Sequence, residues 1–345
     1  MRGFAVLIMI EAHLIDSWTR SPDRESSEFG WAMILGGFGA PLFLFLAGVA
    51  VALSAGSKFR RTTDVRGASS AVVRRGLEIF GLAFLFRLQA LAFGWGHPRT
   101  LLKVDILNIM GPSIMAAAAL WGVCRTTRAR YVALTSAALA MTLLTPLVRT
   151  AAWPAAIPDP IEGYIRPVAG ITSFAFFPWA GFVFAGAVLG LSLDAARTPA
   201  EEARANRWFL VGGAGLALAA FGASYLPSPY ARSDFWTSSP SFFFLRTGLM
   251  TAVIPLAYAW ERRPGAAGRW SPIQQLGRTS LFIYWIHVEL VYGLISLPLH
   301  RSLALPTAWL ALLGFALGML ALSLVKDRLV ARWRHHWRPL AVDAR

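Results

Sequence analysis

Apolar residues in this chain gather into ten long blocks separated by short polar connections. A run of about 20 apolar residues can cross a bilayer as a helix, because a helix satisfies its own backbone hydrogen bonds in hydrocarbon. The ten blocks are Gly3–Trp18, Trp31–Ser54, Val72–Phe93, Ile106–Cys124, Tyr131–Leu147, Ile171–Leu193, Trp208–Tyr225, Phe242–Trp260, Ser280–Leu297 and Thr307–Leu324. The sequence therefore predicts an all-α, polytopic integral membrane protein with about ten transmembrane helices.

The composition excludes other classes of protein. Apolar residues make up 56% of the chain and charged residues 15%, whereas soluble domains average about 45–50% and about 25%. An ordinary soluble enzyme and a disordered chain are both excluded on this basis. The single cysteine, Cys124, excludes an intrachain disulfide and a cysteine-based metal cluster.

The net charge of +15 is explained by topology rather than by a nucleic-acid partner. With ten spans, 23 of the 33 Lys and Arg residues fall on the side that carries both termini and 9 on the opposite side. This alternation follows the positive-inside rule, so we expect both termini in the cytoplasm. The basic stretches Lys58–Arg61 and Lys326–Arg338 can also contact anionic membrane lipids. We expect residues 1–325 to form a single transmembrane domain and residues 326–345 a basic cytoplasmic tail.

Three ionisable residues interrupt the first block, and such residues inside a membrane are candidates for function. His13 lies eleven residues after Arg2, about 16 Å along a helix and thus near mid-membrane. Asp16 follows on the same helix face and can fix the tautomer of His13, as a general base requires. Glu11 points to another face and is a candidate contact for the substrate. The alternative is a buried histidine that a neighbouring helix satisfies.

The ninth block carries a second histidine and carboxylate, His287 and Glu289. Measured from Ser280, His287 lies about 10 Å along the helix, at a depth comparable to that of His13. The two pairs could line one polar cavity, form a proton relay or bind a metal. A metal site needs three or four convergent ligands, so we expect none.

Other charged and polar residues lie at the ends of blocks three and four. Asp105 and Asn108, one turn apart, either cap a helix or bind a hydroxylated substrate. Arg74 and Arg75 either snorkel to the cytoplasmic surface or bind an anionic group such as the phosphates of a cofactor. Arg87 lies further inside block three than Arg74 and Arg75, so it needs a partner or contact with water.

Four motifs in order resemble the transmembrane acyltransferase superfamily. They are the Arg-Gly and histidine, with ten residues between Arg and His, in Arg2–His13; the Pro, Phe-rich run and Gly in Pro41–Gly48; the basic helix start Arg74-Arg75; and the Leu-Gly, Ser, Tyr and His in Leu276–His287. Within the superfamily the chain looks closest to bacterial relatives of heparan-alpha-glucosaminide N-acetyltransferase. The resemblance covers roughly Arg2 to Tyr292.

The resemblance implies a multi-pass protein of the bacterial inner membrane that takes acetyl-CoA, or another acyl-CoA, as donor. Its acceptor would be a hydroxyl or amine of a glycan or lipid-linked sugar. The eukaryotic enzyme has Asn at the position of His13 and its active histidine in a later outward loop. This chain has no histidine between His13 and His97, so the resemblance implies that His13 acts here.

We therefore expect an acyltransferase in which His13 and Asp16 are catalytic and His287 and Glu289 position the acceptor or move protons. Arg74 and Arg75 would hold the CoA phosphates, and Glu11, Asp105 and Asn108 would contact the acceptor. The alternative is a proton-coupled transporter that uses the same buried histidines and carboxylates. A structural scaffold is disfavoured by the number of intramembrane ionisable residues.

Overall fold

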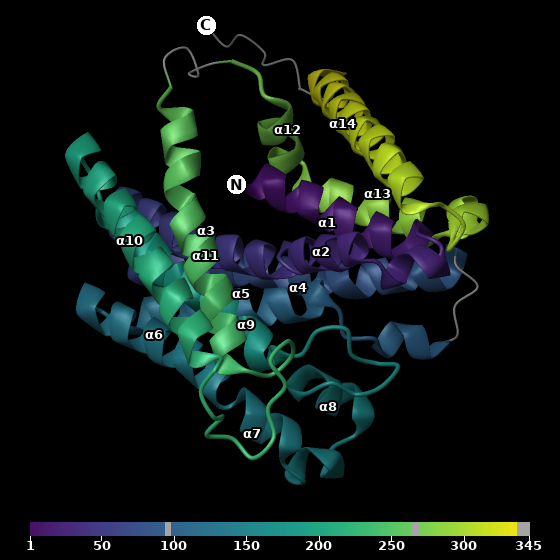
Figure 1. Cartoon of the computed structure of the whole chain (residues 1–345). Helices are drawn as coiled ribbons and strands as arrows, with labels where there is room; N and C mark the ends of the chain where they lie inside the picture. The colour runs from purple at the N-terminus through teal and green to yellow at the C-terminus, as the bar shows by residue number, and fades with distance from the viewer. Residues whose placement is uncertain (94–97, 264–268, 337–345) are drawn as a thin grey trace, which may run out of the picture. The chain divides into compact units, whose positions relative to one another are not determined.

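The computed structural model describes residues 1–93, 98–263 and 269–336, and every named element in these ranges is a helix (Figure 1). The prediction of an all-α chain is confirmed for this described part. The chain divides into two compact units. The first unit, Met1–Gly39 with Gly268–Arg345, surrounds α1, and the second unit is Ala40–Ala267.

The first unit contains α1 (Arg2–Trp18), η1 (Ser21–Glu25), α2 (Ser27–Gly36), α12 (Pro272–Arg278), α13 (Ser280–Tyr292), η4 (Leu294–Leu299) and α14 (Leu305–His336). The second unit contains α3 (Gly39–Thr62), α4 (Val65–Phe93), η2 (Pro98–Leu102), α5 (Ile106–Val123), α6 (Thr127–Leu143), α7 (Thr145–Thr150), η3 (Trp153–Ala156), α8 (Asp159–Ile165), α9 (Phe176–Ala195), α10 (Pro199–Ala223) and α11 (Pro240–Glu261).

Six helical segments of the described residues are long and apolar enough to cross a membrane. They are Ser27–Thr62, Ile106–Val123, Thr127–Thr150, Phe176–Ala195, Pro240–Glu261 and Leu305–Trp333. The predicted number of ten spans is not confirmed, because four of the predicted blocks lie outside these six segments. Of these four, α1 has 17 residues and α13 has 13, whereas α4 and α10 are long enough, with 29 and 25 residues, but contain no sufficiently apolar stretch. A helix of 13 residues is about 20 Å long, less than the roughly 30 Å of the hydrocarbon core.

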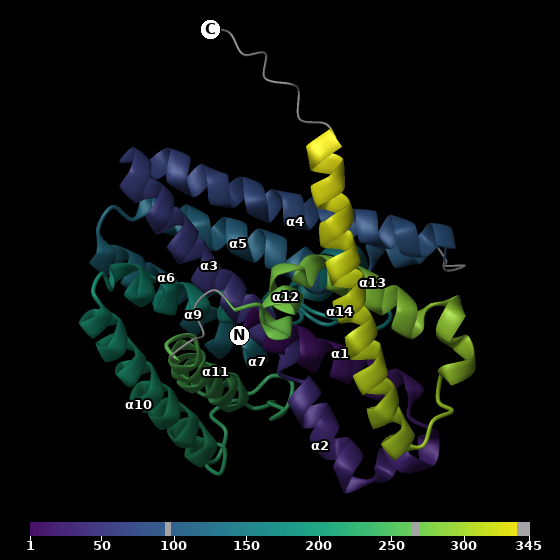
Figure 2. The ribbon, with the colours of Figure 1, turned by 90° about the horizontal axis from the view of Figure 1, so that it is seen from above.

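The first unit is built around α1, which contacts α2, α12, α13 and α14. Figures 1 and 2 show α14 lying beside α1 and α13 in both views. Near the end of α1, Leu14, Ile15 and Trp18 are buried in one apolar cluster with Phe29 of α2 and Val291 of α13. The carboxylate of Asp23 accepts a hydrogen bond of 2.8 Å from the backbone N–H of Leu305. This bond caps α14 and holds the pKa of Asp23 below its usual value.

The C-terminal block continues further as a helix than the apolar pattern predicts. We expected a span over Thr307–Leu324 followed by a tail from residue 326, whereas α14 runs on to His336. Gln275 of α12 donates a hydrogen bond of 2.8 Å to Asp327, so the helix still packs within its unit beyond the predicted end. Residues 337–345 of the predicted tail lie outside the described residues.

Glycines allow the helices of the second unit to approach closely. A Cβ atom on Gly76 of α4 would lie 2.8 Å from the backbone oxygen of Gly111 of α5, and a Cβ on Gly111 would lie 2.8 Å from that of Gly76. Gly213 of α10 and Gly248 of α11 face each other in the same way, at 2.8 and 2.7 Å. Small residues at helix crossings are a main source of packing in membranes, where apolar side chains gain little by leaving lipid.

Candidate active site

Helix α1 runs parallel to the segment formed by α12 and α13, with a constant offset between the two segments. A Cβ on Gly277 would lie 2.8 Å from the backbone nitrogen of Gly3, and Ser17 Oγ donates to the carbonyl of Val291 at 3.5 Å. Both pairs are 274 residues apart, and so is the pair His13 and His287. The register between the two segments therefore brings the two histidines together.

The end of α13 is attached to α1 through one carbonyl. Because α13 ends at Tyr292, its last carbonyls have no partner within the helix. The carbonyl of Val291 accepts from Trp18 Nε1 at 3.1 Å, from Ser296 Oγ at 2.8 Å and from His300 Nε2 at 3.0 Å. The Trp18 bond holds α13 against α1 one turn beyond the histidine pair, and the other two tie the η4 segment to the end of α13.

The two histidines form a hydrogen-bonded pair with a defined direction. His13 Nδ1 and His287 Nε2 lie 2.9 Å apart, and His287 Nδ1 lies 2.9 Å from the carbonyl oxygen of Ile283. A carbonyl oxygen only accepts, so His287 Nδ1 carries the proton, and the Nε2 of neutral His287 must accept. His13 Nδ1 then donates, which leaves the lone pair of His13 on Nε2, the form that a general base requires.

The pair lies among aromatic rings. His287 is fully buried, whereas His13 is partly exposed. The ring of Tyr292 meets the His13 ring edge-on at 5.7 Å between centroids, and the Tyr284 ring lies 6.0 Å from that of His287. Of the two imidazoles, His13 is thus the one that an approaching reactant can reach.

Asp16 has a different partner from the one we expected. We expected it to orient His13 from the same helix face, but its carboxylate forms an ion pair of 2.7 Å with Arg24. Arg24 also donates to the Asp16 carbonyl oxygen and stacks over Phe29, 4.6 Å from the ring centroid. A guanidinium is a stronger partner for a carboxylate than an imidazole is. The group that orients His13 is instead the imidazole of His287.

Glu11 is a buried carboxylate without a hydrogen-bond partner among the described residues. Its side chain faces α2, because a Cβ on Gly36 would lie 3.1 Å from Glu11 Oε2. Only 4% of the residue is exposed. Burying an unpartnered carboxylate is costly, which makes Glu11 a candidate for binding a group that the chain does not itself supply.

Glu289 is partly exposed and lies two residues after His287 on α13. This spacing turns its side chain away from the histidine pair.

Asp105 and Asn108 form the capping box that the sequence offered as one of two interpretations. The Asp105 carboxylate accepts from the backbone N–H of Ile106 at 2.7 Å, and Asn108 Oδ1 accepts from the N–H of Asp105 at 3.0 Å. Asn108 Nδ2 also donates to the hydroxyl of Tyr164 on α8 at 3.0 Å. Burial raises the pKa of Tyr164 above its ordinary value. These bonds connect the start of α5 to α8 within the second unit.

The predicted need of Arg87 for a partner is confirmed. Its guanidinium forms an ion pair of 2.7 Å with Asp105, and the two side chains are 13% and 21% exposed.

Arg74 and Arg75 are exposed on α4, and Arg75 pairs with Glu78 at 2.8 Å.

Arg87→Leu is expected to destabilise the protein by about 3 kcal/mol, because it leaves the carboxylate of Asp105 without its counter-ion. Thermal unfolding in detergent measures the effect. Arg66→Leu, which removes an exposed charge from the same helix, serves as the control and should change stability by less than about 0.5 kcal/mol. Equal stability of the two variants would contradict the assigned role of the ion pair.

A comparison with protein families bears on the hypotheses drawn from the sequence. The family model described as heparan-alpha-glucosaminide N-acetyltransferase, catalytic, matches residues 1–214. The chain belongs to this family. A search of characterised proteins finds no match. Membership indicates a membrane acetyltransferase and lends no support to the transporter alternative.

The region that matches the family model includes His13 but ends before α12. His287 therefore lies outside the matched region and meets His13 through the packing of the first unit. Sequence reasoning missed Arg24 and Tyr292. Arg24 could have been suspected as a counter-ion eight residues after Asp16, whereas nothing in the sequence marks Tyr292. Among the described residues no group of three or more His, Cys, Asp or Glu side chains could hold a metal ion.

Proposed function

We propose that the protein transfers an acetyl group from acetyl-CoA, supplied from the cytoplasm, to a hydroxyl or amine of an extracytoplasmic glycan. The observation that carries this proposal is the hydrogen bond between His13 and His287 in a chain of the acetyltransferase family. The same proposal includes ten spans, both termini in the cytoplasm and a location in the bacterial inner membrane.

The parallel course of α1 and α12–α13 supports the ten-span topology. In that topology Gly3–Trp18 is the first span and Ser280–Leu297 the ninth, so both enter from the cytoplasmic side. All odd-numbered spans cross the membrane in the same direction. The constant offset of 274 residues means that α1 and α13 also run in the same direction.

In the proposed reaction His13 Nε2 removes the proton from the acceptor hydroxyl or amine. The acceptor atom attacks the thioester carbonyl, the carbon–sulfur bond breaks, and the thiolate of CoA takes the proton from the imidazolium. His287 accepts the Nδ1–H of His13 throughout and stabilises the positive charge on that ring. A covalent acetyl-histidine on Nε2, hydrolysed or transferred in a second step, uses the same geometry.

We assign supporting roles to the other polar residues that the sequence marked. Glu11 would receive a hydrogen bond from an acceptor hydroxyl or amine, which satisfies its buried oxygens. Glu289 would pass protons between the site and water. Asp16 would act as a positioning residue that ties η1 to α1 through Arg24. Asp105 and Asn108 would shape the acceptor side through their bonds to α5 and α8.

The donor would be held by its phosphates at the exposed residues Arg74 and Arg75. We expect the double variant Arg74→Ala/Arg75→Ala to weaken acetyl-CoA binding by about tenfold or more, since each charge-assisted bond contributes about 1.5–3 kcal/mol. Isothermal titration with purified protein in detergent measures this. Arg125→Ala/Arg128→Ala, which removes two other exposed charges, should bind within about twofold of the parent.

Turnover of acetyl-CoA with a labelled acetyl group tests the proposed function. The expected result is transfer of label to an acceptor with release of CoA. Binding of acetyl-CoA with neither acetyl transfer nor thioester hydrolysis, whichever acceptor is added, would reject the acetyltransferase proposal.

A further inference from the structure

A cavity of about 440 Å³ opens in the second unit beside α7 and α8. Its lining residues are Arg149, Glu162, Arg166, Pro167 and Val168. The volume falls in the range of about 300–1,000 Å³ found for sites that bind small molecules. The cavity lies in the loop region that the proposed ten-span topology places on the extracytoplasmic side.

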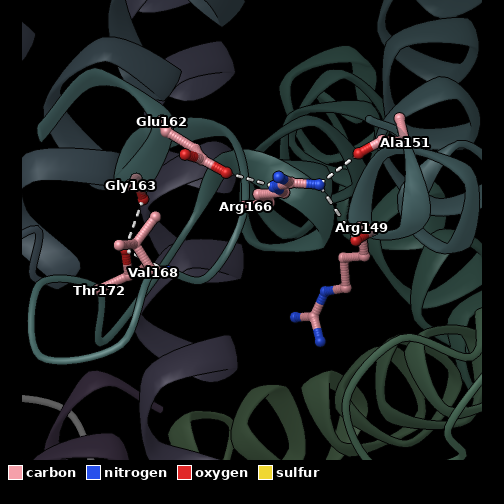
Figure 3. A network of polar contacts seen from close by, with 7 residues as sticks. All are labelled: Arg149, Ala151, Glu162, Gly163, Arg166, Val168 and Thr172. Atoms are coloured by element: carbon pink, nitrogen blue, oxygen red, sulfur yellow. Dashed lines mark hydrogen bonds and ion pairs between the residues drawn. The ribbon is translucent and has the colours of Figure 1, made fainter. Parts of the chain in front are cut away.

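One of its two arginines is fully engaged in building the cavity wall. Arg166 Nε donates to Glu162 Oε1 at 2.6 Å, and its Nη1 donates to the carbonyl oxygen of Ala151 at 2.5 Å (Figure 3). Thr172 closes the loop by donating to the carbonyl of Gly163 at 3.0 Å. The Glu162 charge is therefore neutralised by Arg166, and the wall is held in place.

The side chain of the other arginine, Arg149, has no such partners. The backbone carbonyl oxygen of Arg149 accepts from Arg166 Nη1 at 3.5 Å, but its Nε is buried without a hydrogen-bond partner among the described residues. No dashed line in Figure 3 reaches its guanidinium, which points away from the other residues drawn. Asp234 is a nearby opposite charge, but no hydrogen bond or ion pair joins it to Arg149 among the described residues; its Oδ1 accepts from the backbone N–H and the hydroxyl of Thr237. A buried N–H such as that of Arg149 Nε needs a hydrogen-bond acceptor, and this cavity leaves room for one.

We propose that the cavity binds an acidic sugar, with Arg149 holding its carboxylate or phosphate ester. The planar fork of a guanidinium matches both groups through two parallel hydrogen bonds. A single small anion would leave most of the 440 Å³ unfilled, whereas a sugar ring occupies a larger share of it and still leaves its acidic group free to meet Arg149. Tyr164 of α8 connects this wall to Asn108, so the cavity belongs to the same side of the unit as the start of α5.

The inference that this sugar is part of the acceptor rests on the proposed function. The binding itself does not, because it needs neither acetyl-CoA nor turnover. A protein that binds acidic sugars and transfers nothing would keep the cavity assignment and lose the acetyltransferase proposal.

Isothermal titration of the purified full chain in detergent tests the assignment with glucuronate, glucose 6-phosphate, glucose and inorganic phosphate. We expect both acidic sugars to bind, glucose to show no measurable binding, and inorganic phosphate to bind at least about tenfold more weakly than glucose 6-phosphate. Arg149→Gln should weaken acidic-sugar binding at least about tenfold. The control Arg232→Gln, which removes an exposed charge from the other long loop, should bind within about twofold of the parent.

Several outcomes would overturn the assignment. They are equal binding of glucose and glucuronate, inorganic phosphate binding as tight as glucose 6-phosphate, and unchanged binding in Arg149→Gln. Should Arg149→Gln not fold, Arg149→Lys carries the test, because it keeps the charge and loses the fork. Unchanged glucuronate binding in Arg149→Lys would then count against the proposal.

Discussion

His13→Ala is expected to lower kcat for acetyl transfer by about 10²–10⁴-fold, the contribution of a general base. The loss should fall on kcat, because the imidazole acts on the proton of the acceptor rather than on the binding of CoA. Purified variant and parent are compared with labelled acetyl-CoA under saturating donor. The dissociation constant for acetyl-CoA and the thermal unfolding temperature should stay close to those of the parent.

His300→Ala is the matched control, since it removes another imidazole of the first unit. That ring is engaged with Val291 and Ser296, so we expect lower stability with kcat retained. Full activity of His13→Ala would contradict the assignment of His13 as the base. An equal loss of kcat in both variants would point to general disruption of the first unit.

His287→Ala should lower kcat by about 10²-fold while leaving KM for acetyl-CoA unchanged. A carboxylate that orients a catalytic histidine can contribute about 10⁴-fold to kcat. We expect a smaller contribution from His287, because a neutral imidazole accepts the hydrogen bond without adding a negative charge. His287→Gln keeps an acceptor oxygen for the Nδ1–H of His13, so we expect it to recover part of the activity. A purely structural role would instead give the same loss in both variants, in step with their stability.

Helix geometry placed the two histidines at comparable depths but did not predict that each is the hydrogen-bond partner of the other. The rise of 1.5 Å per residue places His13 and His287 at comparable depths, and the structure brings them within 2.9 Å. Their direct contact depends on the parallel register of α1 and α13, which arises from long-range packing at Gly3 and Gly277. A local pattern cannot encode that register.

Local signals were sufficient where the partner is near in sequence or is required by the membrane. The spacing of Asp105 and Asn108 offered a cap as one of two interpretations, and the structure shows that cap. The depth of Arg87 called for a partner or contact with water, and the structure shows a partner. Asp16 shows the opposite case, because spacing on one helix suggested His13 as its partner, whereas Arg24 folds back from η1 to pair with it. The apolar pattern of block nine also passes Gly293 without marking the end of α13 at Tyr292.

Single-turnover transfer of a labelled acetyl group by the purified protein tests the central claim most directly. Enzyme in excess over labelled acetyl-CoA is mixed with a sugar acceptor, and both the acetylated product and free CoA are followed in time. We expect label to appear on the acceptor in step with CoA release, and His13→Ala to slow both by about 10²–10⁴-fold. Protein that binds acetyl-CoA yet neither transfers label nor releases CoA, or that transfers label equally well without His13, would contradict that claim.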